Sequence, residues 1–264
     1  MGNPLFPLAL VGYTAGIVLS ILGTVKRSSA ARTGSAVSFL LACVLQLAAM
    51  VLYSARVGRF PLSNAWEFLL TLGWMVLALH VLMLFRWKIH ATGLILPPLA
   101  FLMTVVAMVE LPSAVHSEGP LLQRVDILLF HTTLATLGMA LFFVAAAMSL
   151  VYVLQERALK TKRTLKFLDR LPPLERADRA GLEAMLWGFP LFTLGIVTGM
   201  ALSAAEYHRV LLFQAKQVFP LLAWGIFAAV LAARMARGFR GRRAAYLTMT
   251  GFLLGLLTII GIGG

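Results

Sequence analysis

The sequence predicts an all-α membrane protein, a polytopic helical bundle with about eight transmembrane helices and both termini external. Three observations predict this fold class. The chain of 264 residues is 60% hydrophobic and only 12% charged, which is far too apolar for a soluble domain of this length. Eight stretches of about 20 residues carry almost no charge, and a helix of that length crosses a hydrocarbon core about 30 Å thick. Short basic loops follow every second stretch.

These uncharged stretches give the expected helices in chain order. We place them at Leu5–Thr24, Ala36–Ser54, Asn64–Phe85, Ala91–Val109, Val125–Gln155, Ala184–Ala205, Gln217–Arg234 and Ala244–Ile262. Only helices or closed barrels satisfy their backbone polar groups in lipid, so each stretch is expected to be helical throughout. The spans use nearly the whole chain, and we therefore expect a single membrane domain over residues 1–264.

The basic residues define the orientation. Eighteen of the 23 lysines and arginines lie in the loops after helices one, three, five and seven. The alternate loops hold the other five, which are Arg56, Arg59, Arg124, Arg209 and Lys216. The positive-inside rule places the richer set in the cytoplasm, so the protein is expected in the cell inner (cytoplasmic) membrane. The net charge of +13 is thus a retention signal and a contact for anionic membrane lipid, and a nucleic-acid partner is excluded.

The one long polar segment is a basic cytoplasmic loop at residues 156–183. Its first half should continue helix five beyond the membrane until Pro172 and Pro173 end it. Asp178 is then expected to cap the start of helix six. A helix that docks on the membrane surface and a site for a cytoplasmic partner are both interpretations of this segment.

Histidines are the candidate ligands, because an imidazole in an apolar bundle commonly holds a haem iron or a transition metal. His131 lies early in helix five and His80 late in helix three, while His116 and His208 lie in external loops. At 1.5 Å per residue, His131 and His80 differ in depth by about 13 Å, too far for two ligands of one iron. His131 could instead pair with His116 or His208, and His80 would then belong to an inner site or to packing.

A second candidate group opens helix three. Glu67 suits the positive end of the helix dipole, and Asn64 can cap the same end. Trp66 stands beside Glu67, within the run FPLSNAWEFLLTLGW at Phe60–Trp74.

That run resembles a segment of the cytochrome c assembly proteins of the CcsA, ResC and HemX type. Three further stretches are similar to the same family, in the same order. They are the helix that begins HTTLATLGMALFF at His131, the segment LPPLERADRAGLEAMLWGFPLFTLGIVTGMALSA, and the segment LLAWGIFAAVLAARMARGFRGRRAAYLTMTGFLLGLLT. Together they cover most of the chain from Gly58 onward.

The resemblance implies a haem-handling membrane protein that assists cytochrome c maturation, with b-type haem as its ligand. His131 matches the family's external haem-ligand histidine, and His80 lies near a histidine of some members. Trp66 and Glu67 are further candidate haem contacts beside the histidines at 131, 208, 80 and 116. The haem propionates would pair with Arg56, Arg59 or Arg209, since arginine matches a carboxylate bidentately. Trp66 and Phe60 would stack on a haem edge. The small-residue stretch GFPLFTLGIVTGMALSA of helix six is a packing face for another helix, and its glycines would also leave room for the flat porphyrin face.

Two features depart from the fuller members of the family. The place of a Trp-rich external motif reads EYHRVLLFQAKQVFP, without tryptophan or aspartate, and the chain stops before a C-terminal external histidine. The chain therefore resembles the HemX-like branch. It is expected to be an assembly factor and not an enzyme on its own, with other cytochrome c biogenesis proteins as partners.

A regulatory protein is the alternative function. It would act through residues 156–183 on a cytoplasmic enzyme of haem (tetrapyrrole) synthesis, as some HemX-like proteins are thought to do.

Overall fold

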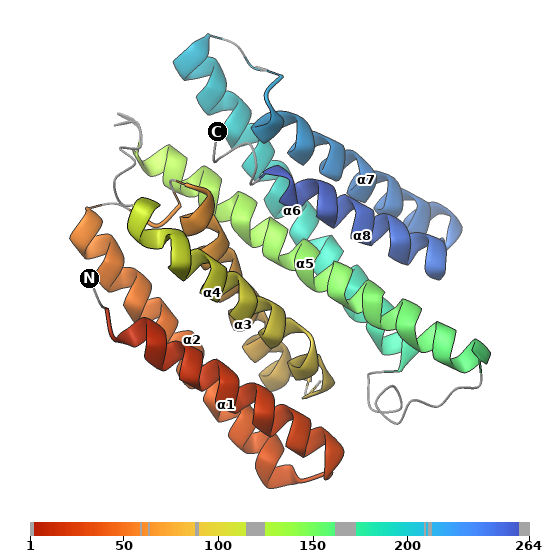
Figure 1. Ribbon diagram of the computed structural model, residues 1–264. Coiled ribbons are helices and arrows are strands. Elements are labelled where there is room, and N and C mark those ends of the chain that lie inside the picture. Colours follow the sequence, from red (N-terminus) through yellow and green to blue (C-terminus); the bar gives the residue numbers. More distant parts are fainter. Residues whose placement is uncertain are drawn as a thin grey trace. The chain divides into compact units, whose positions relative to one another are not determined.

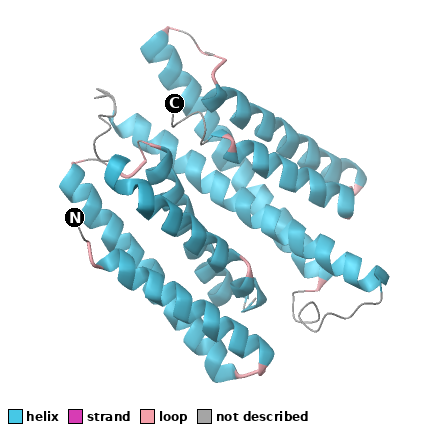
Figure 2. Cartoon of the chain, viewed as in Figure 1, coloured by secondary structure: helices cyan, strands magenta, loops and turns pink. Residues whose placement is uncertain are grey.

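The computed structural model describes residues 3–58, 60–62, 64–87, 90–114, 125–161, 173–208, 210 and 213–258. Within these ranges the chain is built of helices and short connecting loops (Figure 2). Seven of the described helices are long and apolar enough to cross a membrane. The all-α, multi-span fold class is therefore confirmed.

The chain divides into two compact units. The first unit comprises Met1–Gly119 with Arg170–Pro172, and the second comprises Pro120–Asp169 with Pro173–Gly264. Each unit contains four of the main helices, labelled in Figure 1. The expectation of one membrane domain over residues 1–264 stays a prediction.

The first unit pairs its helices in chain order. α1 (Leu5–Val25) packs along α2 (Ser29–Val57), and α3 (Ala65–Trp87) packs along α4 (Leu96–Ala114), with the short helix η1 (His90–Leu94) before α4. Prolines at 97 and 98 fall in the first turn of α4, where a missing backbone N–H breaks no helical hydrogen bond. The expected start at Ala91 was therefore too early, because residues 90–94 form a separate 3₁₀ turn.

One buried side chain joins all four helices of this unit. Gln46 of α2 accepts a hydrogen bond from the Tyr13 hydroxyl of α1 at 2.8 Å. Its amide nitrogen donates to the Leu70 carbonyl of α3 at 3.3 Å and to Thr104 Oγ1 of α4 at 3.1 Å. Gln46, Tyr13 and Thr104 are all fully buried, so each of these polar groups depends on the others for its hydrogen bonds.

The second unit is built on a long helical pair. α5 (Val125–Thr161) and α6 (Leu174–Tyr207) make the most extensive contact, while α7 (Ala215–Arg237) packs on α6 and α8 (Arg242–Leu256) packs on α5 and α7. α5 runs beyond its apolar stretch to Thr161, as expected from the sequence. Residues 162–172 of the basic segment at 156–183 lie outside the described residues, and its regulatory interpretation stays a prediction.

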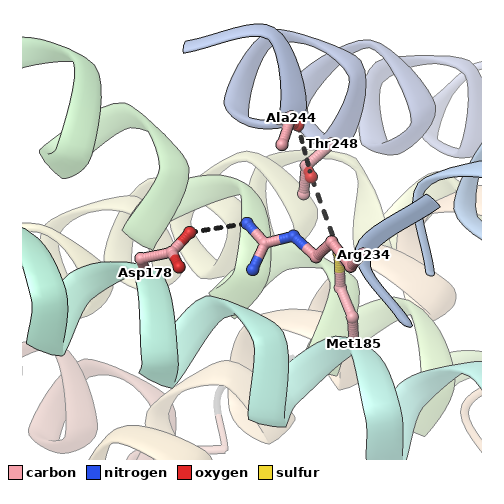
Figure 3. A network of polar contacts seen from close by, with 5 residues as sticks. All are labelled: Asp178, Met185, Arg234, Ala244 and Thr248. Atoms are coloured by element: carbon pink, nitrogen blue, oxygen red, sulfur yellow. Dashed lines mark hydrogen bonds and ion pairs between the residues drawn. The ribbon is translucent and has the colours of Figure 1, made fainter. Parts of the chain in front are cut away.

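Asp178 does not cap α6. The helix already begins at Leu174 after Pro173, so Asp178 lies inside it. Its Oδ1 instead accepts a hydrogen bond from Nη2 of Arg234 in α7, at 2.6 Å (Figure 3). The prediction was wrong because it took the start of the apolar stretch for the start of the helix. Thr248 of α8 lies in the same region and bonds to the Ala244 carbonyl.

Candidate functional site

His131 lies on the face of α5 that packs against α6. Its Nδ1 is 2.7 Å from the carbonyl oxygen of Gly195 and 3.3 Å from Oγ1 of Thr198. The ring is half-buried, whereas most of the residues that follow it along α5 are buried. The ring is thus held by α6 and remains partly exposed.

Glycines on α6 make this close approach possible. A Cβ atom at Gly199 would lie 2.5 Å from Cε1 of His131, and one at Gly195 would lie 2.9 Å from Cα of Ala135. A Cβ at Gly188 would lie 3.0 Å from that of Leu141. The glycine face of α6 therefore packs on α5, as expected of small residues in membrane helices. The expected place of these glycines against a porphyrin face stays a prediction.

The hydrogen bond to Gly195 determines where the imidazole carries its proton. A carbonyl oxygen can only accept, so Nδ1 of His131 is the protonated nitrogen when the ring is neutral. The Thr198 hydroxyl is consistent with this assignment, because it donates to the Leu194 carbonyl at 2.7 Å and leaves its oxygen facing Nδ1. The lone pair of the ring is then on Nε2, the atom that binds metals in many histidine sites.

His208 does not meet His131 in the second unit. It follows the last residue of α6 in a left-handed conformation (φ 53°), and its side chain is exposed. Ten residues separate it from Thr198, or about 15 Å along the helix axis, whereas two ligands of one iron lie about 4 Å apart. His116 lies outside the described residues, as do Arg59 and Arg209.

His80 is fully buried in the first unit. Its Nδ1 lies 3.1 Å from Oγ1 of Thr92, and its ring meets the Phe39 ring edge-on at a centroid distance of 5.1 Å. A hydroxyl can donate or accept, so this contact does not assign the proton to one nitrogen. A Cβ at Gly93 would lie 3.5 Å from Nε2, so the backbone of η1 passes beside the ring.

Glu67 and Trp66 begin α3. The backbone N–H of Glu67 donates to Oδ1 of Asn64 at 2.9 Å, which confirms Asn64 as the cap. The Glu67 side chain is fully buried and accepts a hydrogen bond from the Tyr53 hydroxyl at 2.7 Å, while Trp66 is half-buried. His80 stands thirteen residues further along α3, about 20 Å away, so Glu67 and His80 belong to different ends of the unit.

Two exposed residues flank this region of the first unit. Phe60 is 59% exposed, and Arg56 is exposed in the last turn of α2. Among the described residues no group of three or more His, Cys, Asp and Glu could hold a metal ion by itself.

The residues that hold His131 were not singled out from the sequence. Gly195, Thr198 and Gly199 were seen only as part of a small-residue stretch. The signal was present in the spacing of Gly195 and Gly199, because small residues four apart allow another helix to approach closely. What the spacing alone does not give is the residue opposite, which comes from a helix more than 60 positions earlier.

Comparison with known proteins identifies the family of the chain. Residues 62–263 match the family described as Cytochrome C assembly protein. A "Cytochrome c biogenesis protein CcsA" of Guillardia theta is 24% identical over 272 residues, covering 97% of this chain and 88% of its own length. The proteins of the same name from Microcystis aeruginosa and Porphyra purpurea are 25% and 26% identical, each covering 78% of this chain and 76% of its own. The chain belongs to the cytochrome c assembly protein family.

Proposed function

We propose that this membrane protein acts in cytochrome c maturation by binding haem, with Nε2 of His131 as an axial ligand of the iron. The single observation that carries this proposal is the hydrogen bond from Nδ1 of His131 to the Gly195 carbonyl, which leaves Nε2 as the ring's lone-pair nitrogen. The family and the relatives named for cytochrome c biogenesis support the process.

One imidazole suits haem better than it suits a bare metal ion. The porphyrin already supplies four nitrogens to the iron, so the protein needs to add only axial ligands. The chain has one cysteine, whereas attachment through two thioether bonds would need two, and we propose that the haem is bound without a covalent link, as b-type haem is. When bound, haem is the cargo of the pathway and supplies its own iron.

The other candidate residues have secondary roles in this proposal. His116 remains the candidate for a second axial ligand from the external side, because His208 lies about 15 Å along the helix axis from Thr198, the residue beside His131. Trp66 and Glu67 shape the start of α3, and the burial of Glu67 against Tyr53 supports a part in holding this turn. His80 is the candidate ligand for a separate inner site, supported by its full burial.

We further propose that the protein is an assembly factor that works with other cytochrome c biogenesis proteins in the inner membrane. The external segment between α6 and α7 contains no tryptophan, so a Trp-rich haem platform would come from a partner. This absence also supports placement in the HemX-like branch. The basic loops, held in the cytoplasm, put His131 toward the external side.

Complementation tests the role in maturation. A strain that lacks this gene would carry the wild-type protein, His131→Ala, or the control Gly225→Ala, whose added Cβ has no atom within 4 Å. We expect covalently bound haem in c-type cytochromes, detected by haem staining of denaturing gels, to be lost with His131→Ala and kept with Gly225→Ala. Membrane levels of each variant are measured by immunoblot. Full maturation with His131→Ala at normal protein level would refute the proposal.

A further inference from the structure

The backbone of α6 has a notch opposite His131. We define the α6 notch as the carbonyl of Gly195, the hydroxyl of Thr198 and the bare Cα of Gly199. We propose that the α6 notch fixes the proton and the direction of the His131 ring and strengthens its bond to haem iron, with Gly199 as the positioning residue. This inference rests on the proposed function and assigns a part of the site that family membership does not.

A glycine is required at position 199 because, in a helix, each side chain covers a carbonyl group of the preceding turn. A side chain leans toward the helix N-terminus, so a residue covers the turn before it and lies above the residue four positions earlier. Position 199 therefore stands over the carbonyl of Gly195. With glycine there, the carbonyl is open to the side, and His131 reaches it at 2.7 Å. Alanine would place its Cβ 2.5 Å from Cε1 and 3.0 Å from Nδ1 of the ring.

Thr198 completes the notch without competing for the proton. Its hydroxyl hydrogen has backbone acceptors within its own helix, Leu194 at 2.7 Å and Gly195 at 2.9 Å. The oxygen faces Nδ1 of His131 at 3.3 Å, where it can only add a weak second acceptor. Both neighbours of Nδ1 thus favour a proton on that atom.

When Nδ1–H donates a hydrogen bond, Nε2 becomes a stronger ligand for a metal. A carbonyl partner on the far nitrogen orients a ligating histidine and raises its basicity, and loss of such a partner typically weakens metal binding 10- to 100-fold. The α6 notch would therefore act on the strength of the iron bond and favour ferric haem, without touching the haem itself.

A rescue experiment separates this role from simple packing. The variant His131→Gly would be purified in detergent, supplied with ferric haem, and titrated with imidazole or with 1-methylimidazole. Both bind iron through the ring nitrogen that carries neither hydrogen nor methyl, but 1-methylimidazole has no N–H to donate to Gly195. The ratio of the two affinities is compared with the same ratio for haem in detergent alone.

We expect the ratio of imidazole affinity to 1-methylimidazole affinity to exceed the detergent ratio by on the order of tenfold, since the buried Gly195 carbonyl loses its N–H donor when 1-methylimidazole binds. In His131→Gly combined with Gly199→Ala the preference should vanish, and combined with Gly225→Ala it should remain. If the ratio of the two affinities for His131→Gly equals the ratio in detergent, the role of the α6 notch is overturned and the proposed function is not affected. Wild-type protein that binds no haem would overturn the proposed function, and the role of the notch with it.

Discussion

Removing Asp178 should destabilise the second unit, because it leaves the guanidinium of Arg234 buried without its partner. The Arg234 side chain is only 7% exposed, and that of Asp178 is 17% exposed. Nε and Nη1 of Arg234 have no hydrogen-bond partner among the described residues, so the 2.6 Å bond from Nη2 to Asp178 compensates the buried charge (Figure 3). Breaking a buried ion pair from one side costs about 3–5 kcal/mol.

The partial exposure of Asp178 places the expected loss for Asp178→Ala near the lower end, at about 3 kcal/mol. Arg234→Met should cost less, about 1–2 kcal/mol, because the remaining carboxylate still reaches solvent. The double variant should be no worse than Arg234→Met, because the two losses share one cause.

Equilibrium unfolding in mixed detergent micelles measures these differences. The four proteins of the cycle are wild type, the two single variants and the double variant. The free energy of unfolding of Asp178→Ala could lie within about 0.5 kcal/mol of the wild-type value, or the losses of the two single variants could simply add in the double variant. Either result would show that the ion pair does not stabilise the second unit as its burial indicates.

Two other substitutions test the packing of each unit by the same unfolding measurement. Gln46→Leu should cost about 2 kcal/mol, because the buried Tyr13 hydroxyl loses its acceptor, and adding Tyr13→Phe should recover part of that loss. A Gln46→Leu protein as stable as wild type would contradict the network. Gly138→Ala should cost about 1–3 kcal/mol, because its Cβ would lie 2.8 Å from the backbone nitrogen of Phe192, whereas Gly225→Ala should cost nothing. Equal stability of the two alanine variants would show that the contact of α5 with α6 is looser than described.

Much of the fold follows from the spacing of charges, but helix ends do not. Uncharged stretches mark the part of a helix that lies in lipid, and the helix itself continues into polar sequence. α2 therefore begins at Ser29, where the Ser28 hydroxyl accepts from the Ala31 N–H, and not at Ala36. α6 begins ten residues before Ala184 for the same reason. Where a cap was identified by its chemistry, as at Asn64, the prediction was confirmed.

Contacts between distant helices could not be predicted. Asp178 is a reasonable cap by local rules, and only the fold shows that Arg234, 56 residues later, stands opposite. The histidine candidate at position 131 came from residue type and resemblance, whereas its proton assignment needed the carbonyl of Gly195 from another helix. The local sequence shows which side chains can carry the chemistry, and only the packing of the helices shows which residues those side chains contact.

Visible absorption of the detergent-purified protein tests haem binding at His131 most directly. Wild type, His131→Ala and Gly225→Ala would be purified identically, supplied with ferric haem and freed of excess. We expect a Soret band in wild type and in Gly225→Ala, and a weakened or shifted band in His131→Ala, because the iron has lost its imidazole. An unchanged spectrum and haem content in His131→Ala, or no haem in any of the three proteins, would contradict the assignment.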